Sequence, residues 1–124
     1  MENTTEDLNT CPENPEAEKA KTILAVHDAM DLLKGKWKIV IIGTLSLYGK
    51  KRFMELLREI DGIGPKMLTK ELQELEINNL IKRTVCKTKL KTVEYEITAH
   101  GKSLDKVILE IINWGRDHRR VMRF

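Results

Sequence analysis

A glycine-rich corner between two stretches of helical periodicity constrains the fold of this sequence more than any other feature. The corner reads Asp-Gly-Ile-Gly at residues 61–64 and is followed by Pro65. Apolar residues recur three and four positions apart on both sides of it, which is the periodicity of a helix with one buried face. Two helices joined by so short a connection predict a helix-turn-helix, with Pro65 in the first turn of the second helix, where its missing N–H costs nothing. The apolar positions are Phe53, Leu56, Leu57 and Ile60 before the corner and Leu68, Leu72 and Leu75 after it.

The second of these helices, expected over residues 64–78, carries a polar face opposite its leucines. Its end is predicted at Asn78 and Asn79, because asparagine tolerates the left-handed conformation that is common at helix C-termini. Four polar side chains fall within about 100° of arc on the outer face. They are Lys66, Thr69, Lys70 and Gln73. Any amphipathic surface helix could show such a face, and its place directly after the corner is what suggests a binding role.

A change of period after the second helix predicts a β-hairpin. In residues 92–97 apolar and polar side chains alternate, which is strand periodicity. Residues 81–86, rich in β-branched types, would supply the partner strand. The loop between the strands contains the lysines Lys87, Lys89 and Lys91. The segment 81–97 is therefore expected to form a hairpin with a basic tip.

Further helices are expected on both sides of this unit. An apolar stripe predicts a first helix from Glu16 to near Gly35, and segment 37–48 is apolar enough to be a buried central helix, with Val40 and Tyr48 among its core residues. Thr98 is predicted to cap a last helix, whose wide apolar stripe suggests that another chain covers it. The first stripe consists of Ile23, Val26, Met30, Leu33 and Trp37, and the last of Leu104, Val107, Ile108, Ile111, Ile112 and Gly115.

The length of 124 residues suits one small domain, and the charge is spread unevenly along it. The chain has 22 Lys and Arg against 19 Asp and Glu, but residues 1–18 hold six of the acids and none of the bases, which leaves 22 bases and 13 acids in the remainder. The basic composition of the remaining residues suggests a polyanionic partner such as nucleic acid, although a well-solvated surface could have the same composition. We expect residues 1–15 to form an acidic disordered tail and residues 16–124 to form the folded domain.

Neither a membrane span nor a secretory signal is indicated by the sequence. The longest apolar run, residues 39–42, is far shorter than the roughly 20 residues of a spanning helix. The N-terminal residues lack the positive and apolar regions of a signal peptide. The two cysteines, Cys11 and Cys86, are far apart and show neither a zinc nor a disulfide pattern. We therefore expect a cytoplasmic protein with both thiols reduced.

The order of elements predicts a winged helix-turn-helix, a mainly α fold with a small β-hairpin wing. In this fold the second helix of the corner enters the major groove of double-stranded DNA. Lys66 and Lys70 are suited to phosphate or guanine, and Gln73 to an adenine edge. Thr69 is suited to a phosphate or a thymine methyl group. Further candidates for DNA contacts are Lys51 and Arg52 before the corner, and Lys87, Lys89 and Lys91 in the wing.

Four segments carry a resemblance to a known family: GKWKIVIIGTL, KRFMELLREIDGIGPKMLTKELQELEINNLIKR, VEYEITAHGKSL and INWGRDH. In order and spacing they resemble the HxlR family of winged-helix transcription regulators, in the MarR-like group, over residues 26–118. The resemblance implies a homodimer, built by extra N- and C-terminal helices, that binds an inverted repeat as repressor or activator. It places the recognition helix at 64–78 and the wing at 81–97. The implied dimer interface includes Ile23, Leu104, Val107, Ile108, Ile111 and Ile112.

Some members of that family sense oxidants through a cysteine followed by proline at the start of the first helix. Here the Cys-Pro pair begins at Cys11, earlier in the chain and within the acidic tail, and Leu24 stands at the aligned position. Nearby carboxylates disfavour a reactive thiolate at Cys11, whereas Cys86 has Lys87 as its neighbour. Each cysteine is a candidate either for redox sensing or for an inert thiol.

Enzymatic and metal chemistry find little support in the sequence. The serines, Ser46 and Ser103, lie outside nucleophile patterns, and the three histidines lack metal-ligand spacing. We therefore expect neither enzyme activity nor a cofactor. Two functions remain: a dimeric, sequence-specific DNA-binding transcription regulator, and a winged-helix module that binds an acidic protein partner. A small-molecule effector is a further partner that the sequence leaves open.

Overall fold

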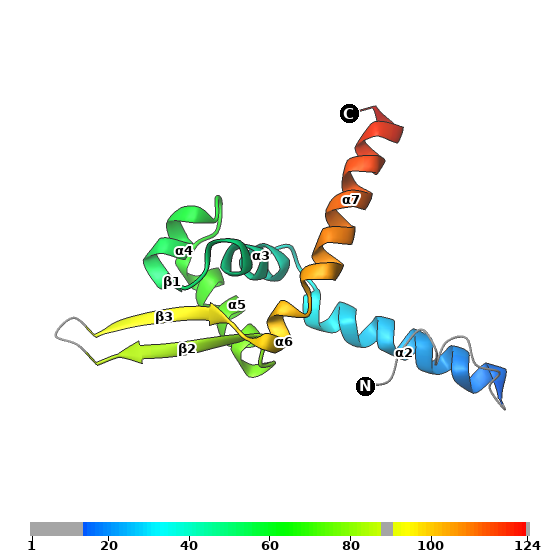
Figure 1. The fold of residues 1–124 in the computed structure, drawn as a ribbon, viewed down its shortest axis with the longest axis horizontal. Coiled ribbons are helices and arrows are strands. Elements are labelled where there is room, and N and C mark those ends of the chain that lie inside the picture. The colour runs from blue at the N-terminus through cyan, green and yellow to red at the C-terminus, as the bar shows by residue number, and fades with distance from the viewer. Residues whose placement is uncertain (1–13, 88–90, 124) are drawn as a thin grey trace. The chain divides into compact units, whose positions relative to one another are not determined.

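The computed structural model describes residues 14–87 and 91–123, and the chain divides into two compact units, residues 1–34 and 35–124. Figure 1 shows a mainly helical chain with one small sheet, which confirms the predicted fold class. The predicted acidic tail, Cys11 and Lys89 lie outside the described residues, except for the start of the first helix. The elements are α2 (Pro15–Leu33), α3 (Lys38–Tyr48), β1 (Lys51–Arg52), α4 (Phe53–Glu59), α5 (Pro65–Ile77), β2 (Ile81–Cys86), β3 (Thr92–Ile97), α6 (Ala99–Lys102) and α7 (Asp105–Met122).

The described part of the first unit is helix α2 and the residues that flank it. Asn14 caps the helix, because its side-chain oxygen accepts hydrogen bonds from the backbone N–H groups of Glu16 and Ala17 at 3.1 and 3.3 Å. The helix ends at Leu33, close to the predicted end near Gly35. Trp37 was expected on its apolar stripe, but it precedes α3 instead, because the chain turns at Gly35 with φ +83°.

The core of the second unit forms where α3, α4 and α5 pack together and against the start of the sheet. Helix α3 is only partly the buried helix that its composition predicts. Its residues Ile41, Ile42 and Leu45 are buried, whereas Val40 and Tyr48 are exposed, so the prediction for these two is wrong. They lie on the side of α3 that faces an open hollow, whose other wall is formed by Asp105, Ile108, Leu109 and Ile112 of α7. The other buried apolar residues of the unit are Leu56, Ile60, Ile63, Leu68, Leu72, Leu75, Leu80, Ile81 and Tyr95.

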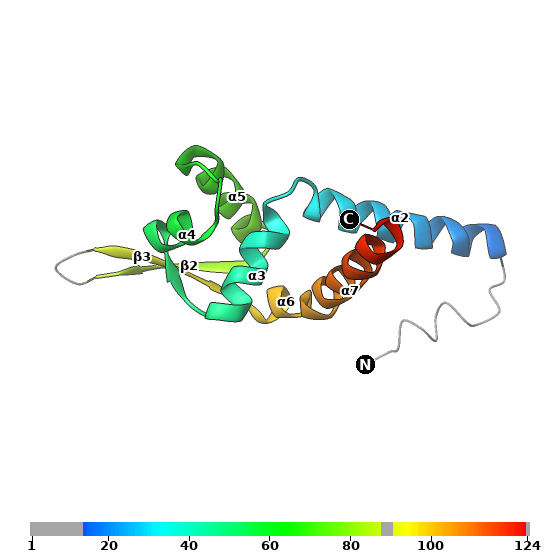
Figure 2. The same ribbon diagram turned by 90° about the horizontal axis from the view of Figure 1, so that it is seen from above.

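The sheet has three antiparallel strands in the order β1-β3-β2, so the predicted hairpin has an additional edge strand. Strands β2 and β3 pair from Ile81 opposite Ile97 to Cys86 opposite Thr92, as predicted. Strand β1 pairs Lys51 with Tyr95. The sequence analysis missed β1, because two residues are too short to show the period of a strand. The hairpin of β2 and β3 extends beyond α4 in two perpendicular views (Figures 1 and 2).

The predicted last helix is in fact two helices. Thr98 caps α6 as expected, and its hydroxyl oxygen accepts a hydrogen bond from the N–H of Gly101 at 2.9 Å. The same hydroxyl donates to the carbonyl oxygen of Asn79 at 2.7 Å. Helix α6 then ends at Lys102, and Leu104 precedes α7 instead of lying within it.

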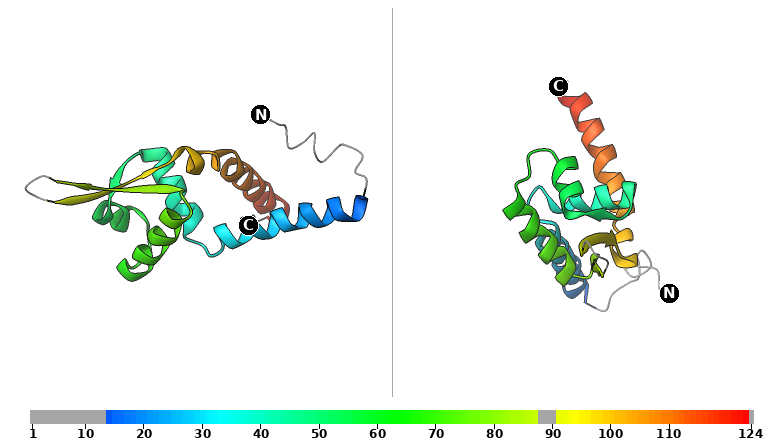
Figure 3. Two further views of the ribbon diagram at one scale, coloured as in Figure 1. Left: turned by 90° about the horizontal axis from the view of Figure 1, so that it is seen from below. Right: turned by 90° about the vertical axis from the view of Figure 1, so that its left-hand side faces the viewer.

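Helix α7 extends away from the rest of its unit. Figures 2 and 3 show it leaving from α6, and its first residue, Asp105, accepts a hydrogen bond from the Ser46 hydroxyl of α3 at 2.8 Å. No residue between Asp105 and Met122 is buried, although one side of the helix is apolar. Among the described helices, none is both long and apolar enough to cross a membrane.

Candidate nucleic-acid interface

The corner between α4 and α5 has the geometry that its glycines predict. Gly62 has φ +88°, a left-handed conformation in which side chains other than glycine are strained. Ile63 turns inward and is buried, so the connection is anchored to the core at its middle. Gly64 is the N-cap of α5, and Pro65 is its first residue. The predicted helix-turn-helix is therefore confirmed, and its turn is fixed by local backbone conformation as well as by packing.

Helix α5 presents one buried and one exposed face. The buried face consists of Leu68, Glu71, Leu72 and Leu75. All four residues that were expected on the outer face are exposed: Lys66, Thr69, Lys70 and Gln73. The helix ends as predicted, with Asn79 in the left-handed region at φ +61°.

Local interactions limit what two of the outer residues can offer to a partner. The Thr69 hydroxyl donates to the carbonyl oxygen of Pro65 at 2.8 Å, so its oxygen remains available as an acceptor and its methyl group for apolar contact. The Lys70 ammonium lies 4.0 Å from a carboxylate oxygen of Glu74 on the same helix. Exposed pairs of this kind are weak, so Lys70 can exchange Glu74 for another anion at little cost.

The segment before α4 brings two predicted contact residues into different environments. Lys51 lies in an ion pair with Glu59 at 2.7 Å, and only 19% of its side chain is exposed. Its hydrogen bond to Glu59 is the main reason why the pKa of Lys51 is raised above 10.5. Arg52 is exposed, and its backbone N–H donates to the carboxylate of Glu55 at 2.8 Å, which caps the first turn of α4. A phosphate would therefore have to displace Glu59 in order to bind Lys51. It could bind the guanidinium of Arg52 without displacing a carboxylate.

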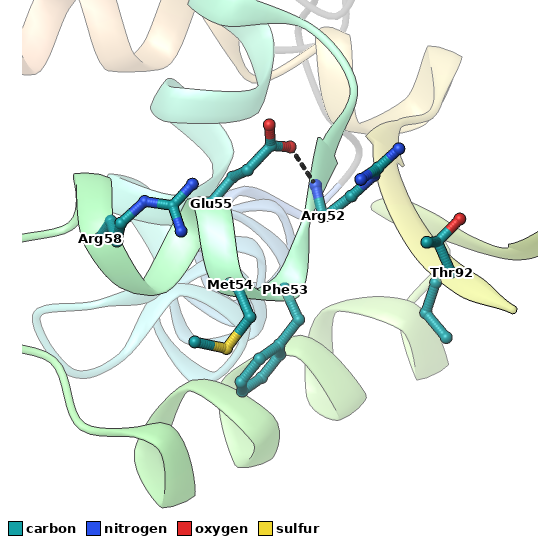
Figure 4. Close-up of a pocket in the computed structure, with 7 residues that line it drawn as sticks. Arg52, Phe53, Met54, Glu55, Arg58 and Thr92 are labelled. Carbon is teal, nitrogen blue, oxygen red and sulfur yellow. Dashed lines mark hydrogen bonds between the residues drawn. The ribbon is translucent and has the colours of Figure 1, made fainter. Parts of the chain in front are cut away.

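A hollow of about 480 Å³ opens beside the start of α4 and carries two arginines on its wall. Figure 4 shows the hydrogen bond from the N–H of Arg52 to the carboxylate of Glu55, which is the main reason for the lowered pKa of Glu55. Within residues 14–87 and 91–123, neither Arg52 nor Arg58 forms an ion pair with a carboxylate. Arg58 is not among the contact residues that were predicted from the sequence. The hollow is lined by Arg52, Phe53, Met54, Glu55, Arg58, Thr92 and Val93.

The wing places positive charge at its tip and mixed charge along its strands. Lys87 and Lys91 are exposed at the two ends of the connecting loop. Along the strands, Lys82 lies 3.9 Å from Glu96, which partly neutralises it. The described part of the wing therefore carries exposed positive charge next to its tip, as predicted, and also at Arg83 in the middle of β2.

Comparisons with known proteins agree with this geometry. The model of the family described as HxlR-like helix-turn-helix matches residues 32–122 of this chain. This chain belongs to the HxlR-like helix-turn-helix family. It is 40% identical to the HTH-type transcriptional regulator YtcD of Bacillus subtilis over 101 residues, which cover 82% of this chain and 79% of that protein. Family membership makes it a transcriptional regulator with a helix-turn-helix DNA-binding fold.

Solved structures show the same fold in further regulators. The redox regulator HypR in its reduced form superposes with a TM-score of 0.73 at 34% identity, over 80% of this chain and 97% of that one. A transcriptional regulator of the MarR family from Enterococcus faecalis V583 superposes with a TM-score of 0.71 at 27% identity, over 94% of this chain and 99% of that one. These similarities confirm the winged-helix fold of this HxlR-like chain and its kinship with MarR-like regulators.

The half-buried thiol of Cys86 in this HxlR-like chain has a different neighbour from the one its sequence suggested. Its sulfur donates to a carboxylate oxygen of Glu94 at 3.4 Å across the β2–β3 pair. Lys50 approaches the same carboxylate at 3.9 Å. The hydrogen-bond partner of the thiol is thus the carboxylate of Glu94. A redox role for Cys86 remains a prediction.

Five of the six predicted dimer-interface residues lie on two helices, one in each unit, and Leu104 lies just before the second helix. Ile23 is more than half exposed on α2. On α7 the exposed residues Val107, Ile111 and Ile112 and the half-exposed Ile108 form one apolar stripe, and Leu104 stands just before it. The stripe is present in the structure as the sequence predicts, and its partner remains a matter for proposal.

Sequence reasoning missed a buried charged cluster behind the outer face of α5. The Lys38 ammonium of α3 donates to Glu71 at 2.5 Å and to Glu74 at 2.6 Å. Burial lowers the pKa of Lys38, but the hydrogen bonds to both glutamates outweigh it, so the pKa lies above the ordinary 10.5. The stabilisation linked to this shift is fully present below pH 10.5 and is lost as the pH rises through the folded-state pKa. One signal was available, because Glu71 falls among the leucines of α5 and so required a buried cation.

Proposed function

We propose that this protein is a homodimeric, sequence-specific DNA-binding regulator that binds an inverted-repeat operator, with α5 in the major groove. One observation carries the proposal: the helix after the fixed corner exposes two lysines, a threonine and a glutamine on the face opposite its buried leucines. These are the side chains that read base edges and hold phosphates. The protein would act on DNA in the cytoplasm, with residues 16–124 as the regulatory domain and residues 1–15 as an acidic tail.

The contact residues divide into base readers and phosphate contacts. In the proposed complex, Lys70 and Gln73 read base edges, and Lys66 and Thr69, nearer the start of α5, contact phosphates or base edges. The exposed Arg52, with Arg58 beside it, contacts phosphates from the start of α4. Lys51 contributes mainly as an electrostatic neighbour, because it is paired with Glu59. Lys87, Lys89 and Lys91 of the wing contact the backbone or the minor groove.

Homodimerisation is proposed from the uncovered apolar stripe of α7. A helix of 18 residues with one apolar side and no buried residue needs a partner surface, and a second copy supplies one of the same kind. Two copies related by a two-fold axis would place two α5 helices against two half-sites. The inverted repeat of the operator follows from that symmetry. A small-molecule effector remains open, and the hollow beside α4 is a place to test for one.

Selection of random DNA duplexes by the purified full chain tests the proposal. We expect enrichment of an inverted repeat whose half-sites lie about one helical turn, or a multiple of it, apart. Lys70→Ala and Gln73→Ala should then weaken binding to the selected duplex far more than to a scrambled one. Lys106→Ala, an exposed lysine on α7, is the matched control and should leave that ratio unchanged.

Two outcomes would contradict the proposal. Equal losses on the selected and scrambled duplexes would remove the base-reading role of α5. Absence of any enriched sequence, with folded protein under reducing and oxidising conditions, would favour the alternative function, a module that binds an acidic protein partner.

A further inference from the structure

The cluster formed by Lys38, Glu71 and Glu74 is the most unusual feature of the core. Only 4% of the Lys38 side chain and 7% of the Glu71 side chain are exposed, against 37% for Glu74. All three lie on two packed helices, with Lys38 in the first turn of α3 and both glutamates on α5. Burying an ammonium group carries a large desolvation cost, which a pair of well-packed apolar side chains would avoid. Stability alone therefore does not explain why this site is charged.

Geometry offers another reason, because the cluster restrains α5 in two directions. The two glutamates are three residues apart, so they stand almost one helical turn from each other along α5. A single ammonium group bonded to both of them at 2.5 and 2.6 Å restrains sliding of α5 along its axis and rotation about it. The leucines that form the rest of the contact are non-directional and would permit small shifts of either kind.

Glu74 connects this buried cluster to the outer face of α5. One of its carboxylate oxygens accepts the hydrogen bond from Lys38, and the other lies 4.0 Å from the ammonium group of Lys70. Glu74 stands at the edge between the buried and the exposed face of the helix, as its intermediate exposure shows. The position of the Lys70 side chain is thereby biased by a carboxylate that Lys38 itself holds in place.

We infer that Lys38 is a positioning residue for DNA recognition, which holds α5 through Glu71 and Glu74 and, through the weak pair of Glu74 with Lys70, biases the position of the Lys70 side chain before DNA binds. The inference rests on the proposed function. Base-edge hydrogen bonds need placement to within about 0.5 Å, whereas phosphate contacts by long flexible side chains tolerate larger shifts. Loss of the cluster therefore lowers discrimination between DNA sequences and leaves sequence-independent binding in place.

The test replaces the buried pair by apolar residues in the full chain. Lys38→Met combined with Glu71→Met removes both buried charges together, and Glu74, which loses Lys38, is partly exposed and keeps Lys70 nearby. We expect an unfolding free energy that is equal or higher, and a ratio of affinities for the selected and scrambled duplexes that falls about tenfold. Lys19→Met combined with Glu16→Met is the matched control, because it removes an exposed lysine–glutamate pair of α2 and should change neither quantity.

A second variant tests the connection to Lys70 and does not depend on the folding of the first. Glu74→Gln keeps the Lys38–Glu71 pair and changes a partly exposed group. We expect it to lower the affinity ratio in the native chain but to have little further effect when Lys70→Ala is already present. Such non-additivity is the signature of two residues that act together.

The outcomes separate this inference from the function on which it rests. An unchanged ratio in the folded double variant, or in Glu74→Gln if the double variant does not fold, would overturn the positioning role of Lys38. Full additivity of Glu74→Gln and Lys70→Ala would overturn the connection to Lys70. If the unaltered protein itself fails to discriminate between duplexes, the proposed function falls, and the inference falls with it.

Discussion

Gly101 of α6 occupies a position that has no room for a side chain. A Cβ atom built there would lie 2.6 Å from Cγ1 of Ile97 and closer still to the carbonyl oxygen of Leu80. Because one of these neighbours is backbone at the start of β2, it cannot move aside. We expect Gly101→Ala to lower the unfolding free energy by about 1–3 kcal/mol in urea denaturation. Gly43→Ala in α3, where an added Cβ meets nothing within 4 Å, should instead raise it by about 0.5–1 kcal/mol.

At Asn79 the backbone conformation restricts which residues are tolerated. Asn79 adopts φ +61° just after α5, and its carbonyl oxygen accepts the hydrogen bond from Thr98. We expect Asn79→Ala to lower the unfolding free energy by about 1 kcal/mol, because the left-handed conformation is less favourable for alanine than for asparagine. Asn79→Gly keeps access to that region and should not lower it. Equal losses for both variants would show that the asparagine side chain matters more than the backbone conformation.

Among the elements, α4 depends on one carboxylate for its first turn. The N–H of Arg52 donates to Glu55, and that bond, with Lys51, Arg52 and Arg58 nearby, holds the pKa of Glu55 below 4.5. A lowered folded-state pKa means that the stabilisation is present above pH 4.5 and is lost as the pH falls through the folded-state value. We expect Glu55→Gln to reduce the unfolding free energy at pH 7 and to lose that effect in acid. Glu76→Gln, on the exposed side of α5, makes the same change outside any helix cap and is the control.

At the scale of the whole molecule, the proposed homodimer depends on the apolar stripe of α7. Ile111 lies near the middle of the stripe, and Asn113 lies on the opposite side of the same helix. We expect Ile111→Glu to shift the protein from dimer to monomer in sedimentation or light scattering, because it would bury a charge in the interface. Asn113→Glu introduces the same residue outside the stripe and should leave the mass unchanged. A monomeric native chain would contradict the proposed homodimer.

The features that were predicted correctly from the sequence are those with a local cause. The corner at residues 61–64, helix α5 with its end just before Asn78 and Asn79, and the β2–β3 hairpin follow from periodicity and turn residues, and all were predicted correctly. Strand β1 and the break between α6 and α7 were missed. Both depend on distant partners, since Lys51 pairs with Tyr95 and Gly101 of α6 packs against Leu80. The residues of β1 and of the break between α6 and α7 therefore carry no pattern of their own from which these features could be predicted.

The longer helices, the β2–β3 hairpin and the outward-facing side chains of α5 could be predicted from the sequence alone, because they follow from the spacing of apolar residues along one segment. The chemical surroundings of the charged residues depend on the tertiary structure. Three lysines that look alike in the sequence have different surroundings in the structure. Lys38 is buried, Lys51 is paired with a glutamate, and Lys70 is exposed and is a candidate for contacts with base edges. The physical reason is that a charge responds to its neighbours in space, and the partners of Lys38 lie 33 and 36 residues away along the chain.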